Sequence, residues 1–87
     1  MTFADERVAA EMGRVMLALY RAGMQVRVWP DALKGRADAR IVAGPSARRR
    51  RSSLHSVTGA GDSPLQAIYA AVERLNERSG AIVVRLD

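Results

Sequence analysis

The residues of this 87-residue sequence whose type and spacing most clearly suggest chemistry are four consecutive arginines, Arg48, Arg49, Arg50 and Arg51. The chain has 14 lysines and arginines against nine aspartates and glutamates, and this arginine run supplies four of the positive charges. Guanidinium groups bind phosphates through paired hydrogen bonds, and basic loops commonly contact nucleic acid. The run therefore predicts a contact with nucleic acid or another polyanion. The alternatives are a contact with a protein partner and a solvated loop that aids solubility.

Three other residues are predicted to extend this binding surface. Residues 24–29 alternate between apolar and polar types, which predicts a strand with Arg27 and Trp29 on its outward face. Residues 38–43 follow the same rule and place Arg40 outward. Tryptophan and arginine are typical interface anchors, so we expect Arg27 and Arg40 to contact the polyanion and Trp29 to contact a partner. For Trp29, a position at the rim of the core is an equally good interpretation.

The sequence shows no constellation of catalytic or metal-binding residues. His55 is the only histidine and cysteine is absent, so neither a zinc site nor a reactive thiolate is expected. Adjacent residues of a strand point to opposite faces, so Ser56 does not pair with His55. Gly59-Ala60-Gly61 precedes a predicted helix, as phosphate-binding loops do, but no P-loop lysine follows and a tight turn is favoured. We predict neither an enzyme nor a cofactor.

Caps, periodicity and chain breakers place the elements that must position these residues. Helices are predicted at residues 3–22 and 64–78, and strands at residues 24–29, 38–43, 52–58 and 81–86. The second helix has a clear start, because Ser63 can cap it, Pro64 suits its first position and Gln66 completes a capping box. The order α-β-β-β-α-β predicts a single α+β domain over residues 1–87. Its two layers are an antiparallel sheet and two helices packed on one face of that sheet.

One resemblance is to double-stranded-RNA-binding domains, which share the order α-β-β-β-α. The residues that resemble the start of the last helix of that family are Gly59, Gly61, Ser63, Ala67, Ala71 and Leu75. In that family, lysines in the first turn of this helix grip phosphates. Here Pro64 and Leu65 take those places, so the resemblance implies RNA binding without that particular contact.

A second resemblance covers residues 24–78 and is to the C-terminal regulatory domain of α-isopropylmalate synthases. The segment from Gly61 to Ala67 is similar to the turn that leads into the helix of its β-β-β-α unit, with Ser63 and Gln66 in place of the usual Gly and Asp. In that family two such units pair and bind an amino-acid effector. The resemblance therefore implies a regulatory dimer that binds a small molecule.

Taken together, the sequence predicts a small, non-enzymatic module that binds nucleic acid or another polyanion through its arginine-rich loop. The alternatives are a protein-interaction module, such as an inhibitor or adaptor encoded by a phage or mobile element, and the effector-binding dimer. A free sheet edge would allow a homodimer. No apolar run approaches the roughly 18 residues of a membrane span, and the acidic N-terminal residues are not those of a signal peptide. We therefore expect a cytoplasmic protein without membrane contact.

Overall fold

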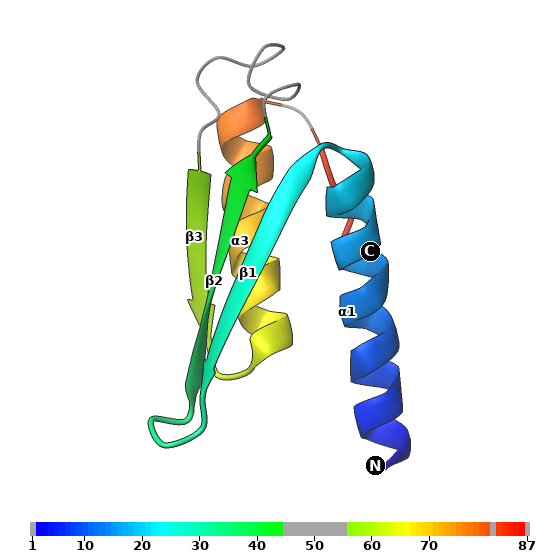
Figure 1. Ribbon diagram of the computed structural model, residues 1–87, viewed down its shortest axis with the longest axis vertical. Coiled ribbons are helices and arrows are strands. Elements are labelled where there is room, and N and C mark those ends of the chain that lie inside the picture. The colour runs from blue at the N-terminus through cyan, green and yellow to red at the C-terminus, as the bar shows by residue number, and fades with distance from the viewer. Residues whose placement is uncertain (1, 45–55, 81, 87) are drawn as a thin grey trace.

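Two helices lie against one three-stranded sheet in the computed structural model, which describes residues 2–44, 56–80 and 82–86 (Figure 1). The elements follow in the order α1 (Phe3–Arg21), β1 (Met24–Asp31), β2 (Arg36–Ala43), β3 (Ser56–Gly61) and α3 (Pro64–Ser79). The sheet is antiparallel with the order β1-β2-β3, and α3 lies behind it in Figure 1 while α1 lies beside β1. The predicted α+β class is confirmed.

The first helix begins at a capping box. The Thr2 hydroxyl accepts a hydrogen bond from the Asp5 N–H at 3.1 Å, and the Asp5 carboxylate accepts one from the Thr2 N–H at 3.2 Å. The bond from the Thr2 backbone lowers the pKa of Asp5, because it stabilises the charged form. At the other end Gly23 has a φ of 80°, a left-handed conformation that suits glycine and lets the chain turn from α1 into β1.

The hairpin of β1 and β2 is longer than predicted. Met24 pairs with Ala43 at one end and Asp31 pairs with Arg36 at the other. The prediction that the first strand ends at residue 29 is wrong, because β1 continues through Pro30 to Asp31. β1 is an edge strand, and proline is tolerated there since its missing N–H can face away from the ladder.

The core lies between the sheet and the two helices. Alternate residues of β2 point into it, and α3 contributes the largest set of buried side chains. Val15 and Leu19 are the residues of α1 that are fully buried. The buried residues of the core are Val15, Leu19, Met24, Ala37, Ala39, Ile41, Ala43, Val57, Ala67, Ile68, Ala71, Val72, Leu75 and Val84.

The glycines before α3 are strand residues and not the predicted turn. β3 runs to Gly61, past the predicted end at residue 58, while residues 52–55 of the predicted strand lie outside the described residues. A Cβ at Gly59 would lie 2.7 Å from the carbonyl oxygen of Ala67 and would also meet the backbone N–H of Ala71. Gly59 is therefore required because α3 crosses the strand at backbone contact distance.

One of the two hydrogen bonds that cap α3 differs from the predicted capping box. The Ser63 hydroxyl accepts the Gln66 N–H at 3.3 Å, as expected. The Gln66 side chain, however, accepts its bond from the Asp62 N–H at 3.1 Å, one residue before the cap. Both bonds satisfy backbone donors where β3 passes into α3, so this short connection is held without a loop of its own.

The predicted fourth strand is wrong, since residues 82–86 form no strand. One side chain of α3 takes the place of a neighbouring strand. The Asn76 carbonyl oxygen accepts the N–H groups of Val83 and Val84 at 2.7 and 3.3 Å, and its amide donates to the Val84 carbonyl at 2.9 Å. Val84 is buried beside it. These bonds satisfy the backbone of the segment outside the sheet, which overrides the strand propensity of its β-branched residues.

Candidate functional site

The face of the sheet that points away from both helices carries three of the predicted site residues. Side chains alternate across the sheet, and the inward positions of β1 and β2 fill the core. Arg27 and Trp29 of β1 and Arg40 of β2 occupy the alternate positions and are exposed. No described helix or strand covers this surface, which we call the outer face (Figure 1).

Arg27 and Arg40 lie directly opposite one another on neighbouring strands, and Thr58 of β3 completes their row. Opposed residues of an antiparallel pair have Cβ atoms about 4.5–5.5 Å apart, and like charges there destabilise the pair. No ion pair joins either guanidinium group to a carboxylate within the described ranges. The row therefore carries two positive charges that form no ion pair within the described residues.

The turn between β1 and β2 creates this juxtaposition. Residues 32–35 connect the strands, and Gly35 has a φ of 63°, which favours glycine. The N–H groups of Lys34 and Gly35 close the turn on the carbonyls of Asp31 and Ala32 at 3.2 and 3.3 Å. If β2 were shifted by two residues relative to β1, the same residues would still face the core. Arg27 would then lie opposite Asp38 and could form an ion pair with it. The turn geometry selects the register with two arginines together.

The acidic groups of the outer face lie toward this turn and have other partners. Asp38 accepts a bond from the Arg36 guanidinium at 2.8 Å, with both side chains about half exposed. Asp31 accepts the Lys34 N–H at 3.3 Å. Trp29 lies opposite Asp38, between this polar end and the arginine row. This residue is 49% exposed, so part of its surface is accessible to a ligand.

The predicted arginine run lies outside the described residues, in the segment that connects β2 to β3. The run residues concerned are Arg48, Arg49, Arg50 and Arg51, and His55 belongs to the same segment. The structure therefore does not bring these arginines together with Arg27 and Arg40 or separate them. Binding by the run stays a prediction.

The ends of this connection show where it joins the sheet. The row of the outer face next to the arginine row contains Gln25, Val42 and Ser56. Ser56 is the first residue of β3, so the connection meets the sheet one row beyond Arg27 and Arg40. The four arginines of the run stand in the sequence between Val42 and Ser56.

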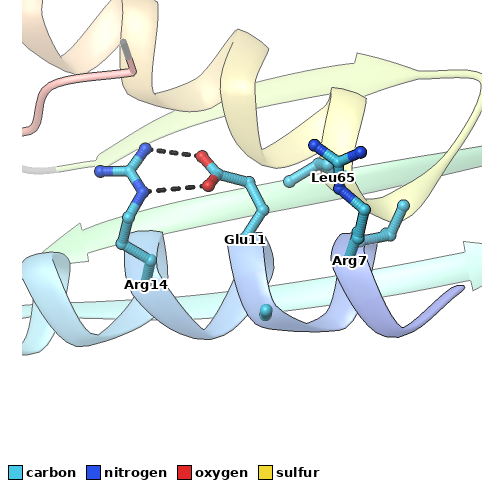
Figure 2. Close-up of a pocket in the computed structure, with 6 residues that line it drawn as sticks. Arg7, Glu11, Arg14 and Leu65 are labelled. Atoms are coloured by element: carbon cyan, nitrogen blue, oxygen red, sulfur yellow. Dashed lines mark hydrogen bonds and ion pairs between the residues drawn. The ribbon is translucent and has the colours of Figure 1, made fainter. Parts of the chain in front are cut away.

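A second surface feature is a groove of about 500 Å³ between α1 and the start of α3 (Figure 2). Arg7, Glu11 and Arg14 of α1 line it together with Leu65 of α3. Glu11 accepts hydrogen bonds from Arg14 at 2.6 and 3.0 Å, which Figure 2 shows as a forked pair. The hydroxyl of Tyr69, on α3, donates to the same carboxylate at 2.8 Å.

This network fixes the charge of Glu11 and joins separate parts of the chain. The bonds from Arg14, and then that from Tyr69, lower the pKa of Glu11 to about 2, and the carboxylate in turn raises the pKa of Tyr69. Arg14 also donates to the Arg85 carbonyl at 3.2 Å, so the group links α1, α3 and the C-terminal segment. Sequence reasoning missed it, although the spacing of Glu11 and Arg14 is that of a helical ion pair. We interpret the groove as a structural junction.

The described residues contain neither a cluster of metal ligands nor a membrane-spanning helix. Among them, no group of three or more histidines, cysteines, aspartates or glutamates could hold a metal ion. None of the helices found there has the length and apolar character needed to cross a membrane.

The chain matches no family model, no curated protein and no solved structure. The two resemblances noted in the sequence therefore remain hypotheses. The function has to be inferred from the geometry and charge of the outer face.

Proposed function

We propose that the outer face of the sheet binds nucleic acid. The observation that carries the proposal is the Arg27–Arg40 pair, two arginines at opposed positions of neighbouring strands without a carboxylate partner among the described residues. Their mutual repulsion is relieved when a phosphate lies between or above them, because each guanidinium then gains a charge-assisted hydrogen bond. The same pair explains why the surface would prefer an anion to an apolar partner.

Single-stranded nucleic acid fits this face better than a duplex. Trp29 is one row away from the arginines and half exposed, so a base can stack on its indole while the arginines hold the backbone. The Thr58 hydroxyl lies in the arginine row and can donate a further bond to phosphate. A sheet face with one aromatic side chain and a positive row offers contacts to a strand whose bases are unpaired.

The arginine run has a subordinate part in this proposal. It adds four positive charges to the connection that follows the row of Val42. We expect these charges to strengthen binding without regard to sequence, because contacts with phosphates carry no sequence information. Replacement of the run should therefore weaken binding to all oligonucleotides alike.

The test is a titration of fluorescently labelled single-stranded RNA and DNA, about 12 nucleotides long, at two salt concentrations. The double variant Arg27→Ala/Arg40→Ala should bind at least about tenfold more weakly. The slope of the logarithm of the binding constant against the logarithm of the salt concentration should become less steep by about 1.4, since each lost phosphate contact removes about 0.7. Absence of binding by the unaltered protein at low salt would refute the proposal and would favour the protein-interaction alternative.

A matched control separates the outer face from general charge. Arg7→Ala/Arg74→Ala also removes two positive charges, from +5 to +3, but from helices α1 and α3. It should change binding by less than about threefold, because long-range attraction alone is screened by salt. An equal loss in both double variants would show that binding follows net charge and not this face.

Trp29 provides an internal reporter, since it is the only tryptophan of the chain. Stacking of a base on the indole should quench its emission in step with the anisotropy of the labelled strand. Binding that leaves the emission of Trp29 unchanged would place the nucleic acid elsewhere on the protein.

A further inference from the structure

α1 carries a second apolar face that the rest of the described structure does not cover. Its core side is buried at Val15 and Leu19. Met16, Leu17 and Tyr20 are nevertheless 38%, 47% and 76% exposed. Met16 and Tyr20 border a hollow beside residues 24–27 of β1, and Leu17 lies farther round the helix from the core. An exposed apolar patch of this kind is typical of an interaction surface.

Small residues continue this face toward the N-terminus of α1. At 100° per residue, Gly13, Leu17 and Tyr20 fall on the same side of the helix as Ala9, from which they are four, eight and eleven residues away. A Cβ placed on Gly13 would meet no atom within 4 Å, so the backbone is open to a neighbour there. Glu6, seven residues before Gly13, lies on the same side and ends this small-residue stretch, whereas Leu17 and Tyr20 carry bulky side chains.

Such a face is complementary to itself when a second copy lies antiparallel to it. A two-fold axis at Gly13 places Leu17 over Ala9 of the second copy, and Ala9 over Leu17 of the second copy. Leu17 then meets the small Ala9 twice, Tyr20 lies opposite Glu6, and the absence of a side chain at the axis allows close approach of the two helices. A heterologous partner would need to reproduce this alternation, whereas a second copy has it by symmetry.

The charges at the two ends of α1 agree with the same arrangement. Glu6 lies in the first turn and Arg21 in the last. Antiparallel pairing about Gly13 brings Glu6 of one copy opposite Tyr20 of the other, one residue from Arg21 and on the same flank of the contact as Arg21. Neither Glu6 nor Arg21 forms an ion pair within the described residues of one chain. The two contacts are equivalent, so each stabilises the same register.

We infer that the exposed face of α1 is the interface of a symmetric homodimer in which two copies of the chain pack their first helices antiparallel. Covering Tyr20 buries roughly 100–200 Å² per copy, against about 500 Å² per partner for a minimal specific interface. The contact is thus small, and the dimer forms in the micromolar range or above. Dimerisation through the edge of β1 is less favoured, because Pro30 interrupts the donors of that edge.

The experiment is sedimentation equilibrium of the full chain between about 1 µM and 1 mM, a range that covers weak and moderate affinities. The mass should rise with concentration from 9.5 kDa to twice that value. Leu17→Glu should raise the dissociation constant by about 100-fold or more, since each copy would bury a charge in the contact. Leu33→Glu is the matched control, because Leu33 is fully exposed in the β1–β2 turn, and it should leave the dimer unchanged.

Exchange of the end charges tests the orientation. Glu6→Arg and Arg21→Glu should each weaken the dimer by about three- to tenfold, because each creates two like-charge contacts, and the double exchange should restore it. The circular dichroism spectrum of every variant confirms that the fold is intact. A monomer at all concentrations, a dimer that tolerates Leu17→Glu, or a double exchange that fails to restore the affinity would each overturn the inference.

Discussion

Replacement of Gly59 by alanine is expected to destabilise the protein strongly. The new methyl group would lie 2.7 Å from the Ala67 carbonyl oxygen, whereas ordinary contacts begin at 3.4 Å. The obstacles are backbone atoms of α3, which cannot turn aside as a flexible side chain can. The whole first half of α3 must therefore retreat from β3 by several tenths of an ångström.

The cost follows from what this half of the helix buries. Ile68 and Val72 are fully buried, and they directly follow Ala67 and Ala71, whose backbone atoms a Cβ at Gly59 would meet. A gap of about 0.5–1 Å forfeits a quarter to a half of a dispersion contact, and overpacking by a methyl group costs about 1–3 kcal/mol or more. We expect Gly59→Ala to lose about 2–4 kcal/mol. That corresponds to a fall of roughly 10–25 °C in Tm for a domain of this size.

The assay is urea unfolding followed by circular dichroism, with Gly13→Ala as the matched control. Gly13 lies in the interior of α1, where its Cβ position is open. The same substitution there should raise stability by about 0.5–1 kcal/mol, because alanine favours the helix. Both variants are measured at a concentration at which the chain is monomeric. Equal stability of Gly59→Ala and the unaltered protein, or the same sign for both changes, would refute the close approach of α3 to β3.

Two other predictions concern side chains that join α1, α3 and the C-terminal segment. The lowered pKa of Glu11 means that its bonds stabilise the fold fully above pH 4.5 and are lost as the pH falls toward about 2. The loss of stability caused by Glu11→Gln, measured from urea midpoints, should shrink across this range. A loss of stability that does not change with pH would contradict the stabilising role of the ionised Glu11. Asn76→Ala should lose about 1–3 kcal/mol, because it leaves partly buried backbone groups without partners. Hydrogen exchange should accelerate at the Val83 and Val84 amides, and unchanged protection there would count against the role of Asn76.

The helices and the first two strands could be predicted because local chemistry decides them. Thr2 and Ser63 cap their helices through contacts within three residues. The alternation along β2 is clear because one face is buried throughout. Arg27, Arg40 and Trp29 were placed on the exposed side by the same alternation, and the structure confirms that placement.

The failures occur where a distant contact overrides the local signal. Gly59 and Gly61 have the composition of a turn, but the approach of Ala67 and Ala71 from α3 determines the role of Gly59 as a strand residue. The β-branched residues near the C-terminus have the composition of a strand, but Asn76 satisfies their backbone instead. Ala67 and Ala71 lie four residues apart and therefore on the same side of α3. This pair of small residues could have indicated that α3 packs closely onto Gly59.

The arginine pair was beyond sequence reasoning for a different reason. Alternation assigns a residue to a face but does not say which residue of the next strand lies opposite it. That choice depends on the turn at residues 32–35, where the left-handed conformation of Gly35 fixes the register. The sequence thus predicts the members of the outer face but not their neighbours.

The dependence on this turn has a consequence for how the protein can evolve. A change in turn length that slides β1 against β2 by two residues keeps every core residue inward, yet it brings Arg27 opposite Asp38 and neutralises the row. The electrostatic character of the outer face can therefore be altered by an insertion or deletion at the hairpin tip, with every charged residue of the strands retained. In relatives of this chain, the length of residues 32–35 would be a better guide to ligand preference than the number of arginines in the strands.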